Sequence, residues 1–93
     1  MGENAITFGK GCIASGDSSF SAGFETEANG ECSIAFGDNT IVNGKNSLGF
    51  GLSGLVRGNN SILGGYNNLL SGNNSISIGY GNLSNGNNSF ING

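Results

Sequence analysis

Large apolar residues recur along the chain at a spacing of fourteen positions, and small or polar residues stand beside each of them. The clearest column is Ile6, Phe20, Ile34, Leu48, Ile62, Ile76 and Phe90. The residue before each member is alanine or serine, and glycine occupies every seventh position from Gly2 to Gly93. A disordered low-complexity chain has no reason to keep columns in phase, so the period predicts a repetitive fold. Six repeats begin at positions 2, 16, 30, 44, 58 and 72, and a half repeat begins at 86.

The segments between glycines alternate locally in apolar and small residues, as in Ser33-Ile34-Ala35-Phe36. Such alternation over four or five residues is typical of short strands. Two strands and two turns per repeat predict an all-β fold, a parallel β-roll or β-solenoid of about six and a half coils forming one domain over residues 1–93. With coils about 4.8 Å apart the rod would be roughly 31 Å long, and its asparagine columns would stack into ladders.

Glycine is expected to supply the positive φ or the tight bend at each corner of a coil. The expected turn glycines are Gly9, Gly16, Gly23, Gly30, Gly37, Gly44, Gly51, Gly58, Gly65, Gly72, Gly79 and Gly86. Asparagines directly before some of them (Asn29, Asn43, Asn85) suit the left-handed region as well. Four glycines outside this phase, Gly11, Gly54, Gly64 and Gly81, should tolerate substitution better.

Composition limits how such a chain can be stabilised. Glycine, asparagine and serine make up about half of the 93 residues, whereas leucine, isoleucine, valine and phenylalanine number only 23. Stability must therefore come from stacking and association.

The charges are few and unevenly distributed. All six acidic residues lie before position 39, no charged residue follows Arg57, and no basic stripe exists, so nucleic-acid binding is not expected. No apolar run is long enough to insert into a membrane.

Catalytic and cofactor signals are weak. The chain has no histidine, so neither a Ser-His nor a Cys-His pair can form, and two cysteines alone cannot complete a zinc site. The G-x-G-x-x-G match at 49–54 contains a repeat glycine, and no helix is predicted after it. Cys12 and Cys32 lie two coils apart in different columns, too far for a disulfide, and are expected to be small buried residues. We predict no enzyme, no cofactor and no metal site.

Four segments carry a resemblance to a known family: Asn4–Gly9, Cys32–Gly37, Asn46–Gly51 and Asn74–Gly79. They resemble the fourteen-residue head repeat of trimeric autotransporter adhesins, whose core is Asn-Ser-aliphatic-Ala-Ile-Gly. The resemblance implies a left-handed parallel β-roll, three chains side by side, and a surface fibre that binds host matrix or cells. Similar repeats occur in viral and phage fibre tips. The second half-repeat, as in Ile41-Val42-Asn43, lacks the family's alanine alternation.

Residue size suggests which side chains face inward. A very thin roll would be lined by the small column Ala5, Ser19, Ser33, Ser47, Ser61, Ser75 and Ser89 and by its neighbours Thr7, Ser21, Ala35, Gly49 and Ser77. The large residues would then form one outer face, too apolar for a soluble monomer and hence an oligomer interface, for which the resemblance implies a homotrimer. The predicted interface residues are Ile6, Phe8, Ile34, Phe36, Leu48, Phe50, Ile76 and Ile78.

The alternative is a wider monomeric solenoid, in which the large residues lie inside with Ile13, Ile41, Leu55, Leu69 and Leu83. Glu27 occupies that second column and argues against burial.

The predicted function is non-enzymatic attachment to a host-cell surface, matrix protein or glycan through a repeated lateral face. Phe24, Leu52, Tyr66 and Tyr80 follow the mid-repeat glycine and are candidate ligand contacts, although packing over the turn explains them too. Attachment implies an extracellular, cell-surface or virion-surface location. The alternative functions are a structural solenoid that stacks end to end into a filament and, less in keeping with the apolar columns, an ice-binding solenoid.

Overall fold

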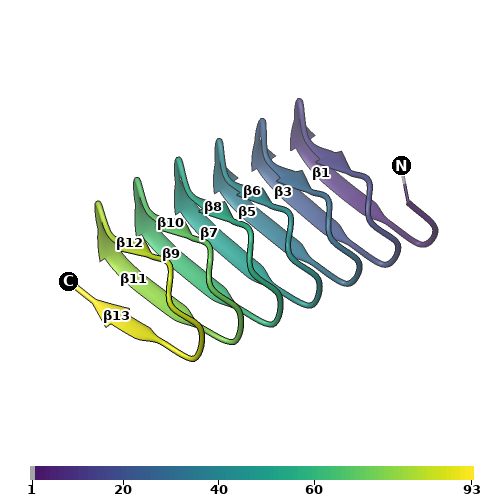
Figure 1. The fold of residues 1–93 in the computed structure, drawn as a ribbon. Helices are drawn as coiled ribbons and strands as arrows, with labels where there is room; N and C mark the ends of the chain where they lie inside the picture. Colours follow the sequence, from purple (N-terminus) through teal and green to yellow (C-terminus); the bar gives the residue numbers. More distant parts are fainter. Residues whose placement is uncertain (1) are drawn as a thin grey trace.

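The computed structural model describes residues 2–93 as a flat ladder of coils, each built from one long and one short strand (Figure 1). The long strands are β1 Ile6–Lys10, β3 Phe20–Phe24, β5 Ile34–Asp38, β7 Leu48–Leu52, β9 Ile62–Tyr66, β11 Ile76–Tyr80 and β13 Phe90–Asn92. The short strands are β2 Ile13–Ala14, β4 Glu27–Ala28, β6 Ile41–Val42, β8 Leu55–Val56, β10 Leu69–Leu70 and β12 Leu83–Ser84. The expected all-β solenoid is confirmed.

The odd-numbered strands form a seven-stranded sheet and the even-numbered strands a six-stranded sheet, and every pairing is parallel. Each residue pairs with the one fourteen positions later, so Ile34 lies beside Leu48 and Gly37 beside Gly51. Because the sequence period equals the coil length, like residues stack in columns. The principal extents are 32 × 20 × 11 Å, and the longest agrees with the length expected from stacked coils.

The interior between the two sheets is only one layer of small side chains thick. Its apolar part is a cluster of Ala28, Ala35, Val42, Val56, Leu63 and Leu70. Serine and threonine line the rest, including Ser33, Ser61 and Ser75, which are almost completely buried. The column of Ser75 is hydrogen-bonded from coil to coil: Ser75 Oγ accepts the N–H of Ser89 at 3.1 Å and lies 3.1 Å from the carbonyl oxygen of Gly86. The predicted small inner column is therefore confirmed.

Large and small inner residues compensate one another from strand to strand. Val42 and Val56 point inward from the short strands where the family pattern has alanine, and Gly49 faces them from β7. A Cβ built on Gly49 would stand 2.7 Å from Cγ2 of Val42 and 3.3 Å from Cγ2 of Val56. In the next coil Leu63 fills the interior, and Gly54 provides its space. The alanine alternation is thus replaced by valine and leucine opposite glycine.

The corners differ from the sequence expectation. The left-handed residues at the corners are mostly asparagine and serine, in two columns that include Asn46, Asn60 and Asn74 (φ 54° to 55°) and Asn39 and Ser53 (φ 55° and 59°). Asn29, Asn43 and Asn85 do not have positive φ, so their assignment to that conformation is wrong. Their column instead stacks side chains, with Asn29 Nδ2 donating to Asn43 Oδ1 at 2.8 Å.

The twelve turn glycines fall into two physically different groups. The mid-repeat group (Gly9, Gly23, Gly37, Gly51, Gly65, Gly79) has φ between 110° and 138° and lies inside the long strands, not at corners. The opening group (Gly16, Gly30, Gly44, Gly58, Gly72, Gly86) does not have positive φ. Gly30 illustrates its requirement: a Cβ there would stand 3.0 Å from the carbonyl oxygen of Asn43 and even closer to that of Gly44.

The off-phase glycines and the cysteines add detail to the sequence expectations. A Cβ on Gly54 would meet a terminal methyl group of Leu63 and one on Gly64 the ring of Phe50, so both would meet side chains and not backbone. Gly11 and Gly81 have φ of 69° and 66°, a backbone conformation that strains other residues even where space is open. Both cysteines are free, as expected, but Cys32 is exposed and Cys12 is only half-buried.

Candidate adhesive surface

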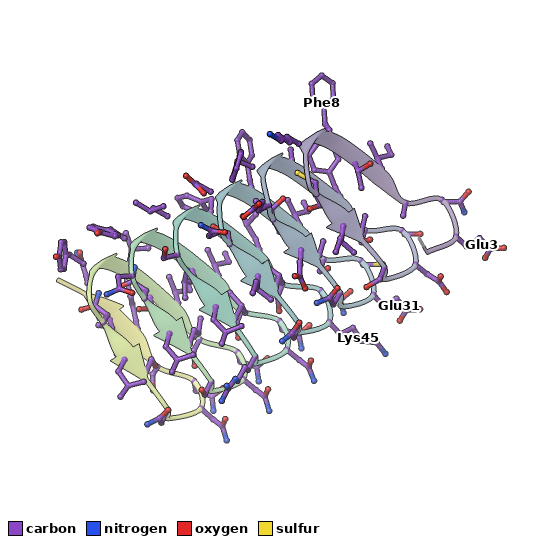
Figure 2. All side chains as sticks on the ribbon, turned by 90° about the horizontal axis from the view of Figure 1, so that it is seen from above. Glu3, Phe8, Glu31 and Lys45 are labelled. Atoms are coloured by element: carbon purple, nitrogen blue, oxygen red, sulfur yellow. The ribbon has the colours of Figure 1, made fainter. Side chains whose placement is uncertain are left out.

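The outer side of the seven-stranded sheet carries two columns of large apolar side chains. Residues in the long strands alternate, so those flanking the buried inner column point outward. Phe8 is 74% exposed, Phe36 57% and Ile6 54%, and Ile34, Phe50 and Ile78 are exposed as well. Leu48 and Ile76 are half-buried. Figure 2 shows the Phe8 ring standing away from the ribbon at the N-terminal end of this face.

The eight residues predicted for an interface therefore share one face. The column that contains Ile6 and Ile34 also contains Phe20, Ile62 and Phe90. The sequence prediction left these three out of the interface, although their fourteen-residue spacing was visible. Phe90 is 70% exposed. The wider monomeric solenoid is wrong, because the large residues of both columns lie outside the roll. Ile13 and Leu83 are exposed on the six-stranded sheet, and Ile41, Leu55 and Leu69 are half-buried there.

A shallow hollow opens in the apolar face between two phenylalanines. Phe36, Gly37, Leu48, Phe50 and Gly51 line it, and none of these side chains is polar. A hollow of this composition offers contact to an apolar side chain.

A second column runs along the edge where the long strands end. Its members are Lys10, Phe24, Asp38, Leu52, Tyr66 and Tyr80. At one end the ammonium of Lys10 lies 5.9 Å from the centre of the Phe24 ring. At the other end the rings of Tyr66 and Tyr80 meet edge to face, with centroids 4.8 Å apart and planes at 73°. All four predicted contact residues, Phe24, Leu52, Tyr66 and Tyr80, are exposed.

The opposite edge of the coils is polar and laddered. Asn60 Nδ2 donates to Asn74 Oδ1 at 3.3 Å, and Asn73 Oδ1 accepts the N–H of Asn59 at 2.9 Å, so the expected asparagine ladders are present. Near the N-terminus charged residues replace asparagine, and Lys45 Nζ lies 3.4 Å from Glu31 Oε1 (Figure 2). Within residues 2–93 no group of three potential metal ligands gathers, and no helix is long and apolar enough to cross a membrane.

In a comparison with protein-family models, the YadA head domain repeat (2 copies) matches residues 14–40, 28–52 and 71–90. These segments together cover well over half of the chain and follow the fourteen-residue coils. The chain belongs to the YadA head repeat family. The resemblance to trimeric autotransporter adhesin heads is therefore confirmed, and the chain is an adhesion-related module. A search of curated proteins finds no significant match.

On this YadA head repeat, the exposed surfaces of the coils carry side chains that a partner can reach. Its side chains supply apolar contact, aromatic rings and amide ladders. The edge column contains cationic and anionic members, Lys10 and Asp38, whereas the face of the seven-stranded sheet exposes mainly apolar side chains. The two surfaces therefore suit different partners, because burying an unpaired charge is far more costly than burying an aliphatic side chain.

Proposed function

We propose that the chain is the head of a trimeric surface adhesin, which attaches to host cells, matrix proteins or glycans without catalysis. The observation that carries the proposal is the apolar face of the seven-stranded sheet. Ile34, Phe36 and Phe50 are exposed on a single chain, because the thin roll has no room to bury them. Association of chains removes such a surface from water at roughly 25 cal/mol per Å² of apolar area.

Three chains side by side, each turning this face toward a common axis, would bury it. The edge column would remain outside, since it includes Lys10 and Asp38, and would serve as the lateral attachment surface. Repetition of that column in three chains lets weak contacts add, raising the apparent affinity by about 10²–10⁴ where several contacts are made together. Such a head acts at the cell or virion surface.

Sedimentation equilibrium tests the assembly. The wild-type chain of 9.3 kDa should sediment as a trimer, and a stable monomer would contradict the proposal. The double variant Ile34→Asp with Phe36→Asp should dissociate or unfold the trimer, because it places charges at the centre of the buried face. Asn59→Asp is the matched control: it adds a charge on the polar edge of the coils, in the column where Asp17 Oδ1 accepts the N–H of Glu3, and should leave the trimer intact.

Attachment is tested with the same variants on immobilised matrix proteins, glycans and whole cells. The wild type and Asn59→Asp should bind, and a dissociated but folded variant should lose most of its apparent affinity. Equal binding by a folded monomer, or one-to-one capture of a small metabolite, would contradict attachment by a multivalent head.

A further inference from the structure

The two tyrosines form an exposed corner at the uncharged end of the edge column. Tyr80 is 68% exposed and Tyr66 44% exposed. Their rings meet edge to face, so the two ring planes enclose an angle that is open to solvent. Apart from its chain neighbours Tyr80 and Asn82, no residue has an atom within 4 Å of where a Cβ on Gly81 would stand, so the space beside this end of the corner is open. Exposed Ser53 and Asn67 flank the column on adjacent coils and provide a hydroxyl and an amide.

We propose that Tyr66 and Tyr80 form a binding site for a neutral glycan. A pyranose ring has an apolar C–H face surrounded by hydroxyls, and this corner has aromatic rings bordered by hydrogen-bonding groups, so the two match in kind. The proposal rests on the adhesive role proposed above and names the ligand class of its lateral surface.

The charge distribution selects a neutral ligand over an anionic one. No charged residue follows Arg57 in the sequence. The cation in the edge column, Lys10, is four coils away from Tyr66, which corresponds to about 19 Å at the spacing of parallel strands. Charges separated by more than about 10 Å are largely screened at physiological ionic strength, so Lys10 cannot hold a sulfate or carboxylate placed at the tyrosines.

Phe24 provides an internal comparison. It is an exposed aromatic residue of the same column, but the Lys10 ammonium lies over its ring. A sugar would have to displace that cation before it could stack there. The site therefore depends on the tyrosine pair and not on every aromatic residue along the edge.

Tyrosine fluorescence reports directly on the proposed site, because the chain has only two tyrosines and no tryptophan. The probes are neutral tetrasaccharides of glucose and of N-acetylglucosamine, and a sulfated tetrasaccharide of the same length. We expect saturable change in tyrosine emission with at least one neutral probe, with a dissociation constant in the millimolar range, and at least tenfold weaker binding of the sulfated probe.

Variants separate stacking from structural effects. Tyr80→Ala should weaken binding of the neutral probe at least tenfold, whereas Tyr80→Phe, which keeps the ring, should stay within about threefold of wild type. Phe24→Ala is the matched control and should change binding less than twofold. Circular dichroism and sedimentation must show that each variant keeps the wild-type fold and assembly. Should Tyr80→Ala lose its fold, Tyr80→Leu, which places there the residue type that the same column has at Leu52, removes the ring and should weaken binding of the neutral probe at least tenfold instead.

Failure of this proposal is distinguishable from failure of the adhesive role. A wild-type trimer that attaches to matrix proteins but gives no saturable response to any neutral probe overturns the glycan site and leaves the adhesive role standing. A response to a matrix protein alone assigns the tyrosines to a protein contact and also overturns the proposal. Because the site lies within one chain, a wild-type chain that is a folded monomer and still binds the neutral probe supports the glycan site while contradicting the trimer.

Discussion

The ring of Phe50 lies against Gly64 of the next coil, so closely that a Cβ built on Gly64 would stand 2.6 Å from Cε2 of the ring. The two residues are Cα partners across β7 and β9 on the apolar face. Phe50 thus uses the space that the missing side chain leaves, and its contact with Gly64 sets the shape of the hollow beside Phe36.

This contact predicts coupling between the two positions. Gly64→Leu should lower the free energy of unfolding by about 1–3 kcal/mol, because the new side chain competes with the Phe50 ring. The double variant Gly64→Leu with Phe50→Ala should recover part of that loss, which a double-mutant cycle on urea denaturation measures. Additive effects would show that the ring and the glycine do not share space in solution. Gly81→Asn, at a corner column that also contains Asn67, is the control and should be near neutral.

Gly51 should be more sensitive than Gly54 to the same substitution. Gly51 has φ of 115°, outside the regions open to alanine, and a Cβ there would also meet the carbonyl of Gly65. Backbone strain of this kind costs about 1–3 kcal/mol before the collision is counted. Gly54→Ala meets only a methyl end of Leu63, which can move. Thermal denaturation should rank Gly51→Ala as clearly less stable, and equal stability of the two variants contradicts the assignment.

Two buried serine hydroxyls should be dispensable. Within residues 2–93, Ser77 Oγ and Ser84 Oγ are the buried side-chain oxygens that have no hydrogen-bond partner. Ser77→Ala and Ser84→Ala should each stabilise the fold by about 1 kcal/mol, because an unpaired buried hydroxyl carries a desolvation penalty. The chain already has alanine in these columns at Ala35 and Ala28.

Ser75→Ala is the matched control for these two variants. It removes an oxygen that accepts the Ser89 N–H and should destabilise by about 1–2 kcal/mol. Denaturation midpoints that move in the same direction for Ser75→Ala and for Ser77→Ala would be inconsistent with this hydrogen-bond pattern.

Replacing Lys45 should improve the polar ladder despite removing the ion pair with Glu31. The pair is exposed on both sides and contributes little. In the same column Asn59 Oδ1 accepts the N–H of Lys45 at 2.8 Å, and Asn73 and Asn87 serve their preceding coils in the same way. Lys45→Asn would offer Glu31 the same bond, adding about 0.5–1 kcal/mol. High salt weakens the exposed ion pair of the wild type, so the gain in free energy of unfolding of Lys45→Asn over the wild type should stay the same or grow. A variant less stable than the wild type contradicts the prediction.

The sequence alone determined the coil length, the strand alternation and the inward column of small residues. Each is a periodic property, and because coils stack at one fixed spacing, residues that share a position in the period lie above one another in the structure. It also placed Ile34, Phe36 and Phe50 on one outer face, since alternation along a strand reverses direction at every residue.

Only the tertiary structure decided the contacts between different columns. Gly49 faces Val42, and Leu63 fills the space beside Gly54. Both contacts depend on how the two sheets approach each other, which no single column specifies. The same holds for the corners: glycine and asparagine both tolerate positive φ, so their presence does not say which column bends. Asn46 and Gly51 acquired their conformations, and Tyr66 its contact with Tyr80, from the closure of each coil onto the one before it.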